Sequence, residues 1–412
     1  MSISGLLPLI LCGVGIYLLF RLRFFYILHP IRTMREIASA LRDRDSRRSL
    51  TLALAGTLGV GNIFGVGAGL MIGGPGCLFW LLLSSFFAMV IKYAETLLAF
   101  DIKGGRGFSD LLRPPFSLIY ASLIVLLSLF MGSAIQSSAV IDVAECGLGL
   151  KPIFSAIILL ILLLPCFIHG VKRIEKITEI IIPLTTIIYI IMCFCVIFMN
   201  FSRLTDVIVE IISSAFRPIS FASGVIPVAV REGFSRGILS NEAGIGSSSM
   251  AHIRGGRRSP HVAGLFGIVE VFFDTALLCS LTGLAILMSG VDIFSFATPM
   301  SLVTAAFVGS LGDFFGYVLT FLILSFAYAT IICWYFYGSE ICRHRGFATV
   351  FVIFLLLPVV AKVDFLIYST DLIIFFMAVI VLSRIIKGRD RISMVALYKK
   401  ESNTEVKSTK LS

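Results

Sequence analysis

The side chains that could bind a polar ligand are few in this sequence, and each stands alone in an apolar segment. Asn62, Gln136 and Thr330 are each flanked by Ile, Val, Ala or Phe residues. Within these segments no nucleophile is paired with a base, and no cysteine and histidine spacing matches a metal site. We therefore expect neither an enzyme nor a resident cofactor. Isolated polar side chains on apolar helices suit the binding and passage of a small solute.

The segment that carries Asn62 is unusual because it is both apolar and rich in glycine. Residues 49–72 contain glycines at 56, 59, 61, 65, 67 and 69, and a glycine inside a helix costs roughly 1 kcal/mol relative to alanine. Small residues could simply let a neighbouring helix pack closely. Alternatively, the helix unwinds at residues 59–62, so that freed carbonyl and amide groups face a ligand or ion. Asn62 favours unwinding, because an amide in hydrocarbon needs a partner.

The composition selects an all-α membrane protein. Of 412 residues, 58% are hydrophobic and 14% charged, and the mean hydropathy is +1.00, which is too apolar for a water-soluble globule. Apolar runs of about 20 residues recur, which excludes a β-barrel. The nine cysteines are scattered and are interpreted as packing residues. The histidines are expected at interfacial positions, in predicted loops or at helix ends: His29, His169, His252, His261 and His344.

The positive charge is distributed unevenly between the two sides of the predicted membrane. When loops are assigned alternately, 30 of the Lys and Arg residues fall on one side and 4 on the other. By the positive-inside rule the rich side is cytoplasmic, so the net charge of +10 indicates no nucleic-acid partner. Arginines follow the first span, residues 4–24, and none precedes it, so we expect a retained helix with its N-terminus outside.

The apolar runs predict eleven transmembrane helices in four parts. Residues 1–48 hold one extra helix and a basic amphipathic stretch, and residues 389–412 form a cytoplasmic tail. Two five-helix sets, 49–200 and 201–388, form the core. The second set opens on a segment interrupted at Pro218, Gly224 and Pro227, followed by a cytoplasmic loop at 235–258. Two discontinuous helices of opposite direction are typical of inverted-repeat transporters.

Five sequence blocks, in order, resemble the sodium:alanine (alanine or glycine:cation) symporter family. They are GTLGVGNIFGVG, GGPGCLFW, KYAE, SNEAGIGSSSMAH at 240–252 and FAYATIICWYFYG at 326–338. The resemblance extends from about residue 48 to 388. It implies a fold of the leucine-transporter type, with two inverted five-helix repeats.

The resemblance also implies the binding residues. Gln136, Thr330 and Trp334 match family positions that contact an amino-acid substrate, and Thr330 and Trp334 lie one helical turn apart. Half-helix amides at residues 59–62 and near Gly224 would hold the substrate carboxylate. The expected substrate-binding set is Thr57, Gly59, Gly61, Asn62, Gln136, Ser223, Gly224, Thr330 and Trp334. By fold analogy, sodium would bind at Ala55, Leu58, Asn62, Ala327 and Thr330.

Some residues depart from the family pattern or add charge to the membrane. Ala329 replaces the usual serine, which removes a hydroxyl from the expected ion site. Glu270 and Asp274 lie four residues apart, and two such carboxylates would repel, which makes a proton easier to hold. They are candidates for proton coupling or gating. For Lys92 and Glu95 we expect an ion pair or snorkelling side chains, with gating as the alternative.

Together these features predict a multi-pass carrier of the cell (inner) membrane. We expect sodium-coupled symport of a small neutral amino acid, alanine or glycine, by alternating access. Two alternatives stay open: a proton-coupled amino-acid carrier, and a degenerate transporter that acts as a sensor. The lipid bilayer, the amino acid and the sodium ion are the expected partners, and the sequence predicts no oligomeric state.

Overall fold

The structure, a computed structural model, describes residues 3–102, 107–216, 227–255, 259–344, 346–360 and 363–397. These residues form helices and connecting turns, and no strand occurs among them. Six helical stretches are long and apolar enough to cross a membrane. They are Cys77–Phe100 (α6), Phe116–Leu148 (α7, η3 and α8), Val171–Met199 (α10), Pro260–Ser289 (α15, η5 and α16), Asp313–Ile341 (α18) and Phe365–Lys387 in α20. The expected all-α membrane protein is confirmed.

A bent pair of helices adds a seventh span, Arg44–Thr57 (α4) with Gly61–Gly73 (η1 and α5). The other four expected spans correspond to shorter helices: Ile3–Arg21 (α1), Pro152–His169 (α9), Val228–Asn241 (α13) and Phe347–Leu356 (α19). Length and composition alone therefore support up to seven spans in the described chain, and the number eleven stays a prediction.

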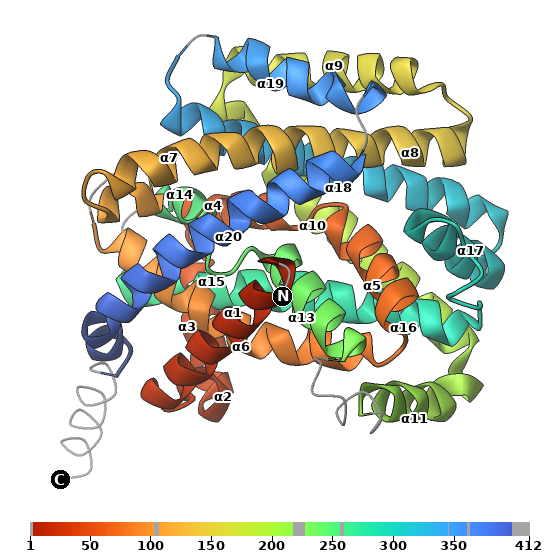
Figure 1. Ribbon diagram of the computed structural model, residues 1–412, viewed down its shortest axis with the longest axis horizontal. Helices are drawn as coiled ribbons and strands as arrows, with labels where there is room; N and C mark the ends of the chain where they lie inside the picture. The colour runs from red at the N-terminus through yellow and green to blue at the C-terminus, as the bar shows by residue number, and fades with distance from the viewer. Residues whose placement is uncertain are drawn as a thin grey trace.

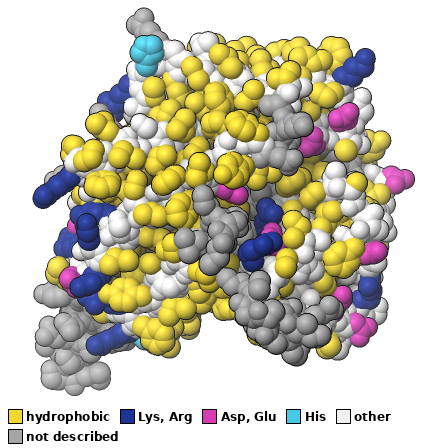
Figure 2. All heavy atoms as spheres, in the orientation of Figure 1, with side chains coloured by type: hydrophobic (Ala, Val, Ile, Leu, Met, Phe, Trp, Pro, Cys, Tyr) yellow, Lys and Arg dark blue, Asp and Glu magenta, His cyan; other side chains and the backbone are white. Residues whose placement is uncertain are grey.

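The helices pack around α6, which contacts α1, α13 and α15. In Figure 1, α9 and α19 lie side by side outside the long α7–α8 helix, with α18 on its other side. Hydrophobic side chains cover much of the face seen in Figure 2, as expected for a surface in contact with lipid. The short helix Pro30–Ala40 (α3) buries none of its residues, which agrees with the expected amphipathic stretch.

The first interrupted helix unwinds where the sequence predicts. α4 ends at Thr57, residues 58–60 are not helical, and a π-helix, η1 (Gly61–Gly65), leads into α5 (Val66–Gly73). The two halves are bent by 50°. Asp43 caps the start of α4 by accepting a hydrogen bond from the Ser46 amide at 2.8 Å. The break therefore falls within a capped, otherwise regular helix, at its glycines.

A second interruption lies where the sequence predicted a cytoplasmic loop. Within 235–258, α13 continues to Asn241, residues 242–248 are irregular, and the short helix Ser249–Ile253 (α14) follows. Glu242, Gly244 and Gly246 have φ values of 54°, 82° and 78°. Glu242, Ser247, Ser248 and Ser249 are all 0% exposed. This part of the expected cytoplasmic loop is therefore buried, and its polar and small residues lie inside the bundle.

The expected break at Pro218 and Gly224 lies outside the described residues, and Pro227 immediately precedes α13. α13 runs antiparallel to α5. A Cβ atom at Gly69 would lie 3.2 Å from Arg236 Cγ, whereas one at Gly73 would lie 3.2 Å from Glu232 Cβ. α14 contacts α4, the other half of the first interrupted helix. α13 therefore lies along α5, and α14 lies against α4.

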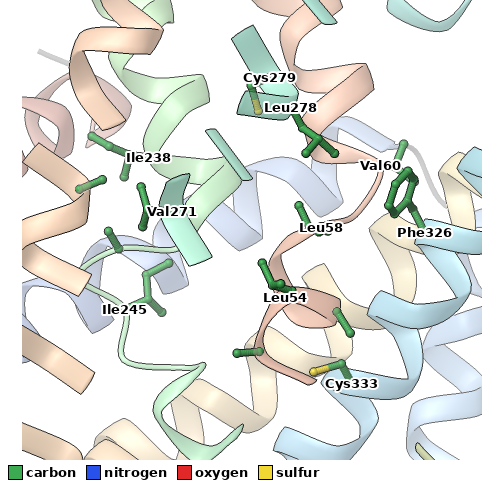
Figure 3. Close-up of a cluster of buried hydrophobic side chains, with 14 of the residues drawn as sticks. Leu54, Leu58, Val60, Ile238, Ile245, Val271, Leu278, Cys279, Phe326 and Cys333 are labelled. Carbon is green, nitrogen blue, oxygen red and sulfur yellow. The ribbon is translucent and has the colours of Figure 1, made fainter. Parts of the chain in front are cut away.

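An apolar cluster fills the space between the two interruptions (Figure 3). Leu54, Leu58 and Val60 come from the first interrupted helix, and Ile238 and Ile245 from the second. Each is at most 8% exposed. Burying a leucine or isoleucine side chain stabilises the folded state by about 1.5–3 kcal/mol relative to leaving it exposed to water. This packing fixes the position of two stretches that lack regular backbone hydrogen bonds.

Candidate functional site

Side chains from α18 and α8 hydrogen-bond to the backbone of the first interruption. The Thr330 hydroxyl is 3.2 Å from the Leu58 carbonyl oxygen, and the Trp334 indole N–H donates to the Gly56 carbonyl at 3.3 Å. Gln136 accepts a hydrogen bond from the Val60 amide at 3.4 Å. Three residues that were expected to bind substrate are thus brought together, Thr330 and Gln136 on the unwound residues and Trp334 on the last turn of α4.

Two glycines allow this close approach. A Cβ atom at Gly59 would lie 2.9 Å from the Thr330 hydroxyl oxygen and 3.2 Å from the Gln136 amide. A Cβ atom at Gly132 would lie 2.1 Å from the Cβ atom of Trp334. A larger residue at 132 would therefore push η3 and α18 apart, and one at 59 would push the Thr330 and Gln136 side chains away from the backbone. Glycine at 59 is needed for contact with other helices.

Asn62 finds its partner on a distant helix. Its side-chain oxygen accepts from the Gly59 amide at 3.2 Å, and its amide nitrogen donates to the Asp274 carboxylate and to the Asp274 carbonyl, the latter at 3.2 Å. Asp274 also accepts from Ser240 at 2.8 Å and from Thr275 at 2.6 Å. Because Ser240 lies at the end of α13, the Asp274 carboxylate joins the two interrupted helices.

A cavity of about 160 Å³ lies beside the first interruption. Val60, Gly61 and Gln136 line it from one side, and an added Cβ atom at Gly61 would meet nothing within 4 Å. Its other polar lining residues are Ser138, Asp142, Arg236, Ser240, Thr370 and Asp371. Since drug-sized ligands occupy pockets of roughly 300–1,000 Å³, this cavity suits a smaller solute.

The residues proposed for sodium are partly brought together. The Leu58 carbonyl and the Thr330 hydroxyl are in contact, and Ala55 and Ala327 are fully buried on α4 and α18, which pack against each other. Asn62 instead binds Gly59 and Asp274. Thr57, expected at the substrate, is buried and lies 3.4 Å from the Leu54 carbonyl of its own helix. Ser223 and Gly224 lie outside the described residues.

The buried carboxylates Glu270 and Asp274 each have their own partners. Glu270 forms ion pairs with Lys92 at 3.2 Å and with His252 at 2.9 Å, whereas Asp274 is bound by Asn62, Ser240 and Thr275. Lys92 also pairs with Glu95 at 3.3 Å, which confirms the expected ion pair. Two of the histidines are buried, and both lie at helix ends as expected. His252 is 0% exposed, and His261 is 7% exposed and hydrogen-bonds to Tyr93.

Several residues around the site were not anticipated from sequence: Ser240, Glu242, His252 and, along the cavity, Asp142, Arg236 and Asp371. A usable signal existed for the first three. The run SNEAGIGSSSMAH puts two acids or amides and a histidine among small residues, between apolar segments. Such composition occurs in loops, but it also suits irregular backbone that lines a cavity inside the membrane.

An all-helical membrane protein with a helix interrupted beside a small cavity has the architecture of a secondary transporter. The sodium:alanine symporter family matches residues 1–410, and the chain belongs to that family. Its relatives are transporters, so the chain is a cation-coupled amino-acid carrier and not an enzyme.

Named relatives agree with this assignment. The "Sodium/alanine symporter AgcS" of Methanococcus maripaludis is 31% identical over 356 residues, which are 80% of this chain and 78% of that protein. The "Probable sodium/glutamine symporter GlnT" of Bacillus subtilis is 30% identical over 82% of this chain and 74% of its own length. A solved nucleobase-cation-symport-1 family transporter, in a closed conformation with bromovinylhydantoin bound, has the same fold. Its TM-score is 0.51 at 16% identity, over 78% of this chain and 74% of that one.

Proposed function

We propose that this protein carries out sodium-coupled symport of a small neutral amino acid, alanine or glycine, by alternating access. One observation carries the proposal: Gln136, Thr330 and Trp334, from two different helices, converge on the last turn of α4 and the unwound residues 58–60 that follow it, beside a small cavity. Backbone carbonyl and amide groups that make no helical hydrogen bonds can bind a zwitterion, whereas those inside a regular helix cannot.

The substrate carboxylate would bind at the start of η1 and α5. Helix N-termini carry a partial positive charge and free amide groups, which favour an anion. Gly61, which borders the cavity without a neighbouring atom at its Cβ position, leaves room for the carboxylate to approach. The second half of the cradle, expected near Gly224, would instead come from the end of α13 at Ser240, which also lines the cavity.

Sodium would bind between the Leu58 carbonyl and the Thr330 hydroxyl, with further carbonyl oxygens from Ala55 and Ala327. Hard cations of this kind prefer oxygen ligands. The contact of 3.2 Å between Leu58 and Thr330 supports this arrangement because an ion could take the place of the hydrogen bond. The printed name of the Methanococcus relative, a sodium/alanine symporter, supports the choice of ion and of substrate.

The fold would hold two inverted five-helix repeats, preceded by α1, with the N-terminus outside and the C-terminus in the cytoplasm of a cell (inner) membrane. The antiparallel packing of α5 and α13 supports the inversion. A cysteine-accessibility scan from either side of sealed vesicles tests the orientation, and labelling of the N-terminus from the cytoplasmic side would contradict it.

Proton coupling through Glu270 and Asp274 remains the second candidate. It is favoured by Ala329, which brings no hydroxyl to the ion site, and by a Bacillus subtilis relative named a putative sodium/proton-dependent alanine carrier, 31% identical over 68% of this chain. Glu270, however, is paired with Lys92 and His252, which do not bind Asp274. This argues against a proton shared between the two carboxyl groups. A sensor that binds substrate without flux is the third candidate.

Purified protein in proteoliposomes tests all three. We expect alanine uptake that needs an inward sodium gradient and is lost in Trp334→Ala. Uptake driven by a pH gradient without sodium, and abolished in Glu270→Gln, would support the proton carrier. Alanine binding without uptake under either gradient would support the sensor. Uptake that depends on no cation gradient would contradict symport.

A further inference from the structure

The second interruption brings three buried carboxylates close to a single lysine. Glu95, Glu242 and Glu270 are all 0% exposed. The Lys92 ammonium lies 3.3 Å from Glu95 and 3.2 Å from Glu270, and it also donates to the Glu242 backbone carbonyl at 3.4 Å. His252, next to Glu270, can add at most one further positive charge. Among the described residues of this cluster, three acids thus face at most two cations.

At least one of the three carboxyl groups must be neutral. An unpaired carboxylate in a low-dielectric interior is far more costly than the protonated acid. The number of donors to each carboxylate shows which of the three is least stabilised in its charged form. Glu95 receives the Gly244 amide at 2.9 Å and the Gly246 amide at 3.2 Å in addition to Lys92. Glu270 is held by Lys92 and by His252.

Glu242 has much weaker support. Its Oε2 accepts from the Ser247 hydroxyl at 2.6 Å, and its buried Oε1 has no hydrogen-bond partner in the part of the chain that the structure describes. Its backbone φ of 54° lies in the left-handed region, which favours glycine over residues with a side chain. A buried acid on strained backbone with an unused oxygen has the features of a functional group.

The titratable groups near this carboxyl come from every neighbouring element. Lys92 and Glu95 lie on α6, Tyr120 on α7, His252 on α14, Glu270 and Asp274 on α15 and η5, and Cys333 and Tyr337 on α18. Only Lys92 and His252 among these can be cationic. Asp274, the remaining fully buried acid, accepts hydrogen bonds from Asn62, Ser240 and Thr275. Asp274 thus has three hydrogen-bond donors, whereas the Glu242 carboxyl has one.

We propose that Glu242 is a proton-binding site on the second interruption, separate from the ion site proposed at Leu58 and Thr330. The carboxyl is protonated in this conformation. When it releases the proton to water, the new carboxylate needs a further donor, which requires residues 242–248 to rearrange. The link to transport rests on the proposed function: uptake acquires a pH dependence that the Glu242 carboxyl sets.

Infrared difference spectroscopy of the full chain in lipid nanodiscs tests the protonation directly. A protonated carboxyl has a C=O stretch that a carboxylate lacks. We expect such a band in the wild type at neutral pH, its loss in Glu242→Gln, and its retention in Glu270→Gln. Glu210→Gln is the matched control, because Glu210 is an exposed acid on α11 (Leu204–Ala215). Absence of the band from the wild type, or its persistence in Glu242→Gln, would overturn the proposal.

A second variant keeps the test decisive if Glu242→Gln does not fold. Ser247→Ala keeps the carboxyl but removes its donor, so the band should remain and move to higher frequency. An unshifted band would place the proton elsewhere. Uptake measured from pH 5 to 9, a range that covers ordinary and raised carboxyl titration, should lose its pH dependence in Glu242→Gln. If the band assigns the proton to Glu242 but no amino acid is transported, protonation stands and the proposed function fails.

Discussion

The hydroxyl oxygen of Thr330 lies 3.2 Å from the carbonyl oxygen of Leu58, across the contact between α18 and the unwound part of the first interrupted helix. The hydroxyl is also 3.0 Å from the Phe326 carbonyl in its own helix. Since it has one hydrogen, it can serve only one of these acceptors at a time. The carbonyl oxygen that does not receive the hydrogen can then bind a cation together with the Thr330 hydroxyl oxygen.

This contact predicts the effect of replacing Thr330. Thr330→Val keeps the shape of the side chain but removes the oxygen, so the sodium concentration for half-maximal uptake should rise about tenfold, equivalent to about 1.4 kcal/mol. Thr330→Ser, which keeps the oxygen, should stay close to the wild type. Sodium-dependent uptake in proteoliposomes measures both. An unchanged sodium requirement in Thr330→Val would exclude the hydroxyl as a sodium ligand.

Two neighbouring glycines offer a matched pair. In Gly59→Ala, the new methyl group would lie 2.9 Å from the Thr330 oxygen, whereas in Gly61→Ala it would meet nothing within 4 Å. Overpacking of this kind costs about 1–3 kcal/mol. The melting temperature should therefore fall in Gly59→Ala and change little in Gly61→Ala. Equal melting temperatures for the two variants would mean that Thr330 and Gln136 do not approach the backbone this closely.

Asn62→Ala should impair both stability and transport. The change removes the donors to Asp274 and the acceptor for the Gly59 amide, and leaving buried groups unpaired costs about 1–3 kcal/mol each. The control is Asn200→Ala, because Asn200 hydrogen-bonds to Val196 and Ser310 at the end of α10, away from the cavity. Full uptake by Asn62→Ala at wild-type thermal stability would contradict this role.

Lys92→Met should be the most destabilising of these substitutions. It leaves Glu95 and Glu270 without their shared cation, and breaking a buried ion pair from one side costs about 3–5 kcal/mol. Exposed Lys172 on α10 is the control, since Lys172→Met should change stability by less than about 0.5 kcal/mol. The double variant Lys92→Met with Glu95→Gln should recover part of the loss. A double variant less stable than Lys92→Met alone would refute the charge argument.

The sequence predicted the first interruption, whereas residues 242–248 were assigned to a cytoplasmic loop, and the difference has a physical reason. Around Gly59 and Asn62, the cost of glycine in a helix and the need of a buried amide for a partner indicate the same residues. At 240–249 the same polar, small residues are also typical of a surface loop. Only the neighbours distinguish the two cases, and Glu95, which binds the Gly244 amide, lies 149 positions away.

The partners of individual charges could not be predicted either. Glu270 and Asp274 are one helical turn apart, which suggested a carboxylate pair, yet they contact different helices. Asn62 and Asp274 are 212 positions apart in sequence. Single-sequence spacing describes neighbours along one helix, whereas these contacts depend on how α4, α6 and α15 pack.

The Asp274 carboxylate binds Asn62 from one interrupted helix and Ser240 from the other. Neither helix can tilt away alone without abandoning a hydrogen bond in hydrocarbon. The half-helices on the two sides of this carboxylate are thus mechanically coupled, and an incoming molecule that offered its own donor to Asp274 could release them in a single event. A carrier with this coupling would not change conformation without its substrate, and it would not transport the coupling ion alone.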